Sequence, residues 1–215
     1  MAMQNNTVDR EEWIRQRAEL LTLEKAHTKE RDRLSELRRQ LPWVKVGKNY
    51  RFELGEAEVS LADLFGDHSQ LIVYHLMFGQ EWDRPCLGCT KWAEALNGTV
   101  SQFKNADATI LAVSSASQGR VGMEQAKRGW NFTWVSAVDT DFNHDYYGSA
   151  DTGVETKSTG TEDVHFDRGE NHGISVFYKN EAGEVFHTYS CYNRGVEPMN
   201  GSMAYLDILP KGRTW

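Results

Sequence analysis

The sequence predicts a mixed α/β sheet flanked by helices and preceded by one long N-terminal helix. Three observations predict this class. Apolar segments of strand length alternate with helical patterns over residues 71–139. Two further strand patterns follow at 174–190, joined by a polar turn. An unbroken, highly charged helical pattern covers residues 9–41.

The composition is that of a folded protein with an acidic surface. The chain has 215 residues, of which 40% are hydrophobic and 11% aromatic, enough for one sizeable domain. A formal charge of −7 argues against nucleic-acid partners and anionic membrane surfaces. The sequence has neither an apolar run of bilayer length nor the apolar core of a secretory signal. We therefore expect no membrane partner and a cytoplasmic location, where thiols stay reduced.

The N-terminal helix is predicted to begin after Asp9, a plausible N-cap, because neither Gly nor Pro interrupts the pattern before Pro42. Apolar side chains recur along it at a seven-residue spacing, at Trp13, Leu20, Leu34 and Leu41. Two interpretations stay open: the helix packs on its own domain, or it joins two copies in a homodimer. We divide the chain into a helical extension, 1–41, and a domain, 42–215.

The domain begins with short strand patterns and a turn over residues 43–65. LIVYHLMF at 71–78 is almost continuously apolar, as in a strand buried on both faces of a sheet. A helix is predicted after Pro85, because proline is common at a helix start. The remaining predicted elements are strands at 108–115 and 132–139, helices at 117–130 and 202–209, and the hairpin at 174–190. The polar stretch 148–172 is predicted to be an insertion, either a flap over the site or a poorly ordered segment.

RPCLGCTKW, residues 84–92, holds Cys86 and Cys89 two residues apart. Such a pair is a redox dithiol, half of a metal site, or two core cysteines. The third cysteine, Cys191, makes the count odd, which disfavours a structural disulfide framework. A second C-x-x-C pair, which a zinc site of that type needs, is missing from the sequence. The redox dithiol is therefore the favoured interpretation.

A C-x-x-C between a buried strand and its helix is the thioredoxin-like arrangement. Two intervening residues in a helix's first turn bring both sulfurs to one face, close enough for a disulfide. Cys86 lies where unpaired N–H groups and the helix dipole stabilise a thiolate, so we expect it to be the nucleophile. Cys89, one turn deeper, is expected to resolve the mixed disulfide. The predicted fold is thus a thioredoxin-like mixed sheet.

Other candidate site residues come from the neighbouring segments. His75, on the strand before the motif, is the candidate for exchanging a proton with Cys89, although a core histidine bonded to a backbone carbonyl is the alternative. Tyr74, Trp82, His172 and Gly173 are predicted to line the substrate side of the site. This dithiol chemistry requires no cofactor.

The chain also resembles a known family over nearly its whole length. The segments that carry the resemblance include QLIVYHLMFG (70–79), CLGC (86–89), GWNFTWVS (129–136), HGISVFYK (172–179) and FHTYSCYNRG (186–195). They resemble a bacterial, thioredoxin-like family of unknown function, domain family 899. The resemblance implies a thioredoxin-like fold and a dithiol–disulfide oxidoreductase whose partners are protein or small-molecule thiols and disulfides.

The sequence departs from ordinary thioredoxins, which leaves other functions open. Gly173 stands where thioredoxins place a cis-proline that aligns bound peptides. A peroxiredoxin-like peroxidase is one alternative, although Gly79 and Asp83 replace the proline and hydroxyl residue that bind peroxide in that group. A Cu(I) protein, for copper delivery or copper-dependent thiol oxidation, is another, with Cys86, Cys89 and His172 as ligands. A non-catalytic interaction module acting through the N-terminal helix is the third.

Overall fold

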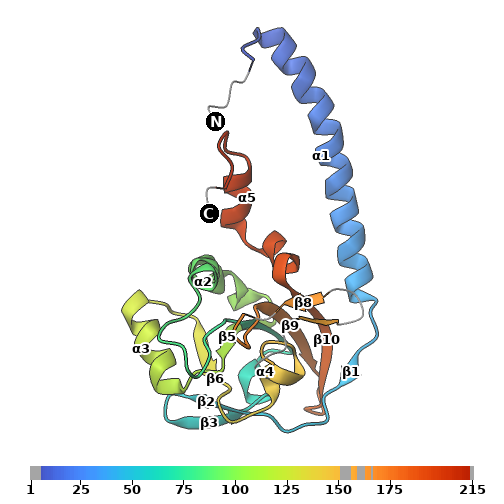
Figure 1. Cartoon of the computed structure of the whole chain (residues 1–215). Helices are drawn as coiled ribbons and strands as arrows, with labels where there is room; N and C mark the ends of the chain where they lie inside the picture. The colour runs from blue at the N-terminus through green and yellow to red at the C-terminus, as the bar shows by residue number, and fades with distance from the viewer. Residues whose placement is uncertain (1–5, 151–155, 159–162, 166, 214–215) are drawn as a thin grey trace.

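A computed structural model describes residues 6–150, 156–158, 163–165 and 167–213 of the chain. Its strands are β1 Val44–Lys45, β2 Arg51–Leu54, β3 Ala57–Ser60, β4 Gln70–His75, β5 Ala108–Ser114, β6 Thr133–Ser136, β7 Thr156–Ser158, β8 Asp163–His165, β9 Gly173–Lys179 and β10 Val185–Tyr192. Eight of these described strands form one sheet in the order β1-β10-β9-β4-β5-β6-β2-β3, while β7 and β8 pair separately (Figure 1). The predicted mixed sheet is confirmed.

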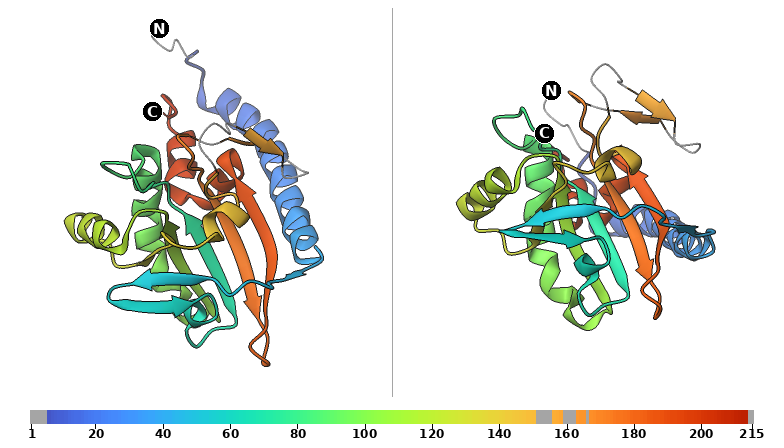
Figure 2. Two further views of the ribbon diagram at one scale, coloured as in Figure 1. Left: turned by 60° about the horizontal axis from the view of Figure 1, so that its bottom comes forward. Right: turned by 90° about the horizontal axis from the view of Figure 1, so that it is seen from below.

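The helices follow the predicted order along the chain. They are α1 Arg10–Arg39, α2 Leu87–Thr99, α3 Gln118–Arg128, α4 Phe142–Asp145 and α5 Gly201–Asp207, with 3₁₀ turns η1 Asp63–Phe65, η2 Val100–Asn105 and η3 Asn193–Met199. The predicted hairpin is the antiparallel pair β9–β10. Both the C-x-x-C helix and the short C-terminal helix are confirmed as α2 and α5. Figure 2 shows the same sheet from two further sides.

Strand β4 lies in the middle of the sheet, where it pairs in parallel with β5 and antiparallel with β9. Its near-continuous apolar sequence fits this position because helices or loops cover both faces of the sheet there. Side chains alternate between the two faces. Leu71 and Val73 pack into one hydrophobic cluster, whereas Tyr74 packs into the other, which also contains Cys89.

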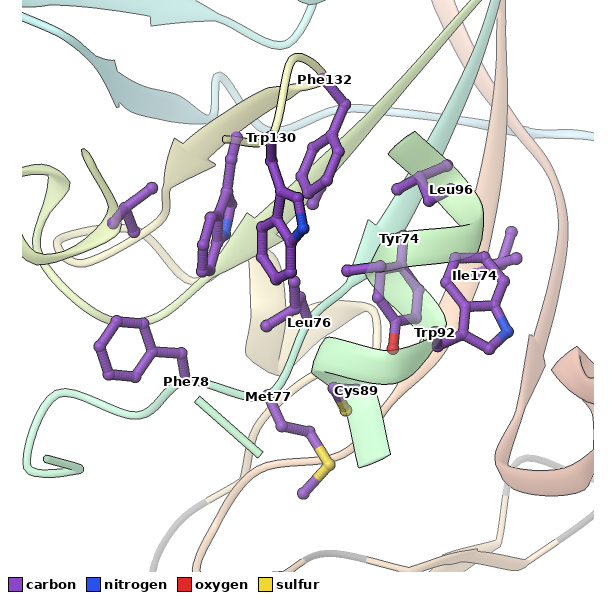
Figure 3. Packing of buried hydrophobic residues seen from close by; sticks show 14 of the residues in the cluster. Tyr74, Leu76, Met77, Phe78, Cys89, Trp92, Leu96, Trp130, Phe132 and Ile174 are labelled. Carbon is purple, nitrogen blue, oxygen red and sulfur yellow. The ribbon is translucent and has the colours of Figure 1, made fainter. Parts of the chain in front are cut away.

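The two faces of the sheet carry separate hydrophobic clusters. The cluster under α2 is rich in tryptophan and includes Trp92, Leu96, Trp130 and Trp134 (Figure 3). The cluster on the other face is rich in phenylalanine, with Phe52, Phe65, Phe142 and Phe177. Each such buried side chain contributes about 1.5–3 kcal/mol of hydrophobic stabilisation relative to an exposed one. The C-x-x-C helix is therefore fixed to the sheet by its own apolar face.

Helix α1 extends away from the sheet, and none of its residues is buried (Figure 1). The predicted cap is confirmed, because the Asp9 carboxylate accepts a hydrogen bond from the Glu12 N–H at 2.8 Å. Only the C-terminal end of α1 contacts the sheet, where the Arg38 guanidinium lies 5.5 Å from the Tyr189 ring centroid. The interpretation that this helix packs along its own domain is wrong, because its apolar positions face outward.

The polar insertion 148–172 is described in part. Its hairpin pairs β7 with β8, and its two flanks meet where the Ala150 N–H donates to the Gly169 carbonyl at 2.8 Å. Residues 151–155, 159–162 and 166 lie outside the described residues, so the choice between a flap and a poorly ordered segment stays a prediction. Within the described part of the chain, no helix combines the length and apolar character needed to cross a membrane.

Candidate functional site

The loop from β4 to α2 places the cysteine motif at the end of the central strands. Leu76 N–H donates to the Val113 carbonyl at 2.9 Å, and Ala116 N–H donates to the Phe78 carbonyl at 2.8 Å. The Cys86 N–H then donates to the Met77 carbonyl at 3.0 Å, which returns the chain to the strand end. Backbone bonds therefore fix where Cys86 lies before the helix begins.

Cys86 is the N-cap of α2 and is half-buried. Its pKa is lowered from 9.0 to about 6, chiefly because the Cys89 side chain supports the Cys86 thiolate by hydrogen bonding. Burial opposes this effect, while the backbone N–H groups of Cys89 and Gly88 reinforce it. The carboxylate of Asp167 raises the pKa slightly in return. Cys86 is thus mostly thiolate at neutral pH.

Cys89 lies one turn deeper and is buried. Its pKa is raised well above 9.0, because it supports the Cys86 thiolate and because burial disfavours charge. All three cysteines are free thiols in this structure. The motif therefore combines an ionised outer sulfur with a protonated inner one.

Tyr74 supplies the polar group beneath Cys89. Its hydroxyl points toward the Cys89 sulfur, and its ring stacks on Trp92 with centroids 4.1 Å apart (Figure 3). The hydroxyl is buried and, among the described residues, no hydrogen bond of ordinary geometry satisfies it. Burial, followed by the charges of Cys89 and Cys86, raises the pKa of Tyr74, so the hydroxyl keeps its proton. It is positioned to stabilise a thiolate at Cys89 when one forms.

A cavity of about 240 Å³ opens beside both sulfurs. Its inner wall comes from β4 and α2, and its outer wall comes from η3 and α5. The lining residues are Tyr74, Cys86, Gly88, Cys89, Trp92, His172, Asn193, Arg194, Val196, Glu197 and Met203. We call it the dithiol cavity. Of the predicted residues, the structure brings Tyr74 and His172 together with both cysteines here.

The prediction that His75 exchanges a proton with Cys89 is wrong in its geometry. His75 follows Tyr74 directly, so its side chain lies on the opposite face of β4. There its Nδ1 lies 3.0 Å from Asn143 Oδ1 and its Nε2 lies 2.9 Å from Ser175 Oγ. Burial lowers the pKa of His75 to about 4, which keeps the ring neutral. It is a core histidine, as in the alternative interpretation, but its partners are side chains rather than a backbone carbonyl.

Two further predicted residues lie away from the dithiol cavity. Trp82 is buried and lines a different cavity, with the Arg168 guanidinium 4.0 Å from its ring centroid. Gly173 is an interior sheet residue that pairs with His75 on β4 and Tyr192 on β10. A Cβ at Gly173 would lie 2.3 Å from the Tyr192 ring, so glycine serves close packing there. Neither position is among the residues that line the dithiol cavity.

The predicted copper ligands do not form a three-donor set. Across the residues that the structure describes, no three His, Cys, Asp or Glu side chains come together as metal ligands. His172 instead makes a 3.1 Å hydrogen bond from its Nε2 to the Asn193 carbonyl, and burial lowers its pKa. The two cysteines remain soft ligands by themselves. Copper binding stays a prediction.

A second cavity, of about 440 Å³, lies around Trp82 and contains a buried carboxyl group. Burial raises the pKa of Glu170 to about 8, against the hydrogen bond from Ser115 that lowers it. Asn143 Nδ2 donates to Ser115 Oγ at 3.1 Å, and Asn143 Oδ1 meets His75. Glu170 thus ends a buried polar chain that runs from His75 through Asn143 and Ser115.

Sequence reasoning missed Glu170 and the outer wall of the dithiol cavity. Glu170 lies within a polar stretch where nothing in the pattern marks one acid as buried. Arg194, Val196 and Met203 come after the hairpin, more than 100 residues beyond the motif. The chain leaves the sheet after β10 close to α2, which places η3 and α5 beside the cysteines. The hydrophobic periodicity of the sequence does not predict this long-range contact.

Fold and site together define a thioredoxin-like α/β protein with a C-x-x-C at the end of its central strand. The chain belongs to the family described as "Bacterial protein of unknown function (DUF899)", whose model matches residues 2–215. The predicted family is thereby confirmed. A comparison with curated proteins found no match.

Two solved structures from Xanthomonas campestris share the fold of this chain at low sequence identity. A cysteine-to-serine mutant of Xanthomonas campestris peroxiredoxin Q aligns with a TM-score of 0.53 at 18% identity, covering 78% of this chain and 96% of that one. The X. campestris bacterioferritin comigratory protein, described for alkyl peroxide reduction, aligns with a TM-score of 0.52 at 18% identity, covering 77% and 96%. A thioredoxin-like protein from Porphyromonas gingivalis aligns with a TM-score of 0.45 at 14% identity, covering 81% and 95%.

Replacing Cys89 tests the origin of the Cys86 thiolate. Cys89→Ala removes the largest stabilising contact, so the pKa of Cys86 should rise above about 6 by about one pH unit or more. Cys89→Ser keeps a hydroxyl donor and should raise it less. The pH dependence of alkylation by iodoacetamide, read by mass, measures this pKa. Cys191→Ala is the control, and an unchanged Cys86 titration in Cys89→Ala would contradict the assignment.

Glu170→Gln tests the buried carboxyl. The folded protein holds this proton up to a pKa of about 8, whereas the unfolded chain releases it near 4.5. The wild type should therefore lose stability as pH rises through that window. The variant should lack this loss. Its free energy of unfolding, compared with that of the wild type, should therefore rise by about 2–4 kcal/mol between pH 5 and pH 8. Urea unfolding across pH measures the difference, with Glu181→Gln in the exposed hairpin turn as control. Parallel pH curves for wild type and Glu170→Gln would show that Glu170 is not held protonated.

Proposed function

We propose that this protein is a dithiol–disulfide oxidoreductase in which Cys86 is the nucleophile and Cys89 the resolving thiol. The observation that carries the proposal is the opposed pKa shift of the two sulfurs, lowered to about 6 at Cys86 and raised at Cys89. A thiolate is the attacking species in thiol–disulfide exchange, and only the outer sulfur is one at neutral pH.

The first step is attack of the Cys86 thiolate on a substrate disulfide, R–S–S–R′. The new bond joins Cys86 Sγ to one substrate sulfur, the S–S bond of the substrate breaks, and R′S⁻ leaves. Because Cys86 lies on the wall of the dithiol cavity, the substrate sulfur approaches from there. The charge passes to the leaving thiolate, which takes a proton from solvent.

The second step is attack of Cys89 on Cys86 Sγ. Cys89 gives up its proton, forms the Cys86–Cys89 disulfide and releases the second substrate thiol. The Tyr74 hydroxyl is positioned to donate a hydrogen bond to the Cys89 thiolate as it forms, which lowers the free energy needed to ionise a buried thiol. Two electrons pass from the dithiol to the substrate, and an external dithiol restores the protein. The reverse sequence oxidises a dithiol.

The partners that this chemistry implies are thiols and disulfides, of proteins or of small molecules, without a cofactor. We propose the cytoplasm as the compartment, because an odd number of cysteines, all free here, suits a reducing environment. The acidic surface gives no reason to propose a nucleic-acid partner.

Titration of the purified protein in glutathione redox buffers tests the proposal. We expect a reversible two-electron couple confined to Cys86 and Cys89, read as the mass of alkylated thiols. Cys86→Ser should abolish disulfide exchange by at least about 100-fold, because no other ionised thiol lines the dithiol cavity. Cys191→Ser is the matched control and should keep the couple. Exchange that survives in Cys86→Ser, or thiols that never interconvert, would refute the mechanism.

A peroxidase is the second candidate, favoured by the shared fold with peroxiredoxin Q and by the half-buried thiolate of Cys86. Cys86 would attack the O–O bond of a peroxide, releasing an alcohol or water and becoming a sulfenic acid, which Cys89 would then convert to the disulfide with loss of water. Asp83 and Asp167 line the space on one side of Cys86 and give it no hydroxyl donor there. Consumption of hydrogen peroxide by the reduced protein, faster than disulfide exchange, would favour this candidate.

We also propose that α1 joins two copies of the chain. Its apolar side chains are exposed over most of the helix, including Trp13 at 48%, Leu20 at 50% and Leu23 at 68%. Trp13, Leu20 and Leu34 follow a seven-residue spacing, with His27 in the slot between Leu20 and Leu34, as in a helix that packs on another helix. A helix of 30 residues is about 45 Å long, which provides room for such contact beyond the domain.

Sedimentation of two forms of the protein tests this dimer. The full chain should sediment as a dimer, and a chain beginning at residue 42 should be a folded monomer, because α1 buries nothing against the sheet. Leu20→Lys should weaken the dimer by at least about tenfold, since it puts a charge among these apolar positions. Glu36→Lys, on the exposed polar side, is the control. A monomeric full chain at high concentration would rule the dimer out.

A further inference from the structure

We propose that the dithiol cavity selects a small, uncharged thiol or disulfide whose reacting sulfur carries one aromatic or branched apolar group. This inference rests on the proposed function and names its substrate class. The cavity is the concave surface next to both sulfurs, and its exposed lining is almost entirely apolar. A substrate whose sulfur reaches Cys86 from this cavity places the group beside that sulfur against this lining.

The size of the dithiol cavity fits one ring or branched chain. Its volume is about 240 Å³. An apolar cavity of about 150 Å³ binds benzene in a well-studied protein, so the larger dithiol cavity has room for a benzyl-sized group. The stacked rings of Tyr74 and Trp92 form the floor, and Val196 and Met203 face them from η3 and α5. Aromatic and branched apolar groups gain most from such a lining.

The backbone around the cavity is not available to a peptide. Peptides bound beside a sheet are held by main-chain hydrogen bonds to a free edge. Here the His172 carbonyl accepts a hydrogen bond from the Asn193 N–H at 3.2 Å, and Gly173 pairs with strands on both sides. The segment that would align a peptide is already engaged by β4, β10 and η3. The apolar walls of the dithiol cavity therefore have to recognise the substrate.

The charges at the cavity disfavour an anionic substrate such as glutathione. Arg194 is the one cation among the described lining residues, and it pairs with Glu197 at 3.1 Å. Burial lowers the pKa of His172, so its ring is neutral. Outside the cavity, Asp167 acts on Cys86 as a negative charge, and it lines the neighbouring space together with Arg84 and Arg168. Within the cavity, a substrate carboxylate would meet the Glu197 carboxylate and a cation that is already paired with it.

Exchange rates with two matched uncharged disulfides test the inference. Benzyl 2-hydroxyethyl disulfide carries the ring, and bis(2-hydroxyethyl) disulfide lacks it. The reduced protein should lose its Cys86 thiol about tenfold faster with the benzyl compound, since burying a ring of this size stabilises by 1.5 kcal/mol or more, about a tenfold effect in rate. Glutathione disulfide, included as the anionic case, should react more slowly than either.

Two methionine variants show where the ring binds. Met203→Gln replaces a lining thioether with an amide of similar size and should remove most of the benzyl preference, measured as the ratio of the rates with the two uncharged disulfides. Met199→Gln is the matched control, because Met199 is exposed on η3 and does not line the cavity. Binding of benzyl alcohol should also shift the methyl resonance of Met203 in the wild type and leave that of Met199 in place, a readout that needs no variant to fold.

The outcomes separate the two proposals. Equal rates with both uncharged disulfides, or a benzyl preference that Met203→Gln leaves intact, would overturn the substrate class while the dithiol function stands. A reduced protein that reacts with none of the three disulfides would overturn the proposed function, and the substrate class with it. A Met203 resonance that does not respond to benzyl alcohol also counts against the apolar site.

Discussion

The site depends on the interaction between two sulfurs that share one proton. Cys89 supports the thiolate at Cys86, and this contact outweighs the burial that would otherwise keep Cys86 neutral. The contact exists because the backbone of Cys86 is tied to Met77 and because α2 begins there. The same contact therefore lowers the pKa of Cys86 and raises the pKa of Cys89. Titration belongs to the pair, and neither cysteine would behave the same way alone.

The Cys86–Cys89 contact also determines the energetics of the proposed thiol–disulfide exchange. A thiolate that is stabilised in the folded, reduced protein makes the dithiol state more stable relative to the disulfide. The inner sulfur has the opposite property, because a buried thiol with a raised pKa is slow to attack and poor as a leaving group. The Tyr74 hydroxyl acts chiefly on that second sulfur, and it acts most strongly when Cys89 is charged. In the proposed mechanism, Tyr74 therefore belongs to the step that resolves the mixed disulfide rather than to the step that forms it.

The contrast between Tyr74 and His75 shows how far the sequence could lead. The strand at 71–78, the helix after Pro85 and the position of Cys86 at its start all follow from local patterns, and the structure has each of them. Which face of β4 looks toward α2 does not follow from the sequence, because the strand is apolar on both faces. A histidine was the chemically attractive choice for a proton acceptor. The alternation of the strand instead turns the tyrosine toward Cys89 and the histidine toward Asn143.

The outer wall of the dithiol cavity depends on contacts that the hydrophobic pattern of the sequence does not predict. No residue of α5 is buried, so apolar packing alone does not hold this helix in place. Arg213 instead connects the end of the chain to Glu197 at 3.0 Å and to Asp207 at 2.6 Å. Both acids have a lowered pKa from the Arg213 contact, yet these groups are solvent-accessible, and such ion pairs add little to stability.

The inner wall of the dithiol cavity, with Tyr74 and Trp92, belongs to the rigid core, whereas the outer wall is held by weak contacts. Segments of that kind open locally at a small free-energy cost. An apolar group can therefore enter beside Cys86 by displacement of α5, without disturbing the sulfurs or the strand beneath them.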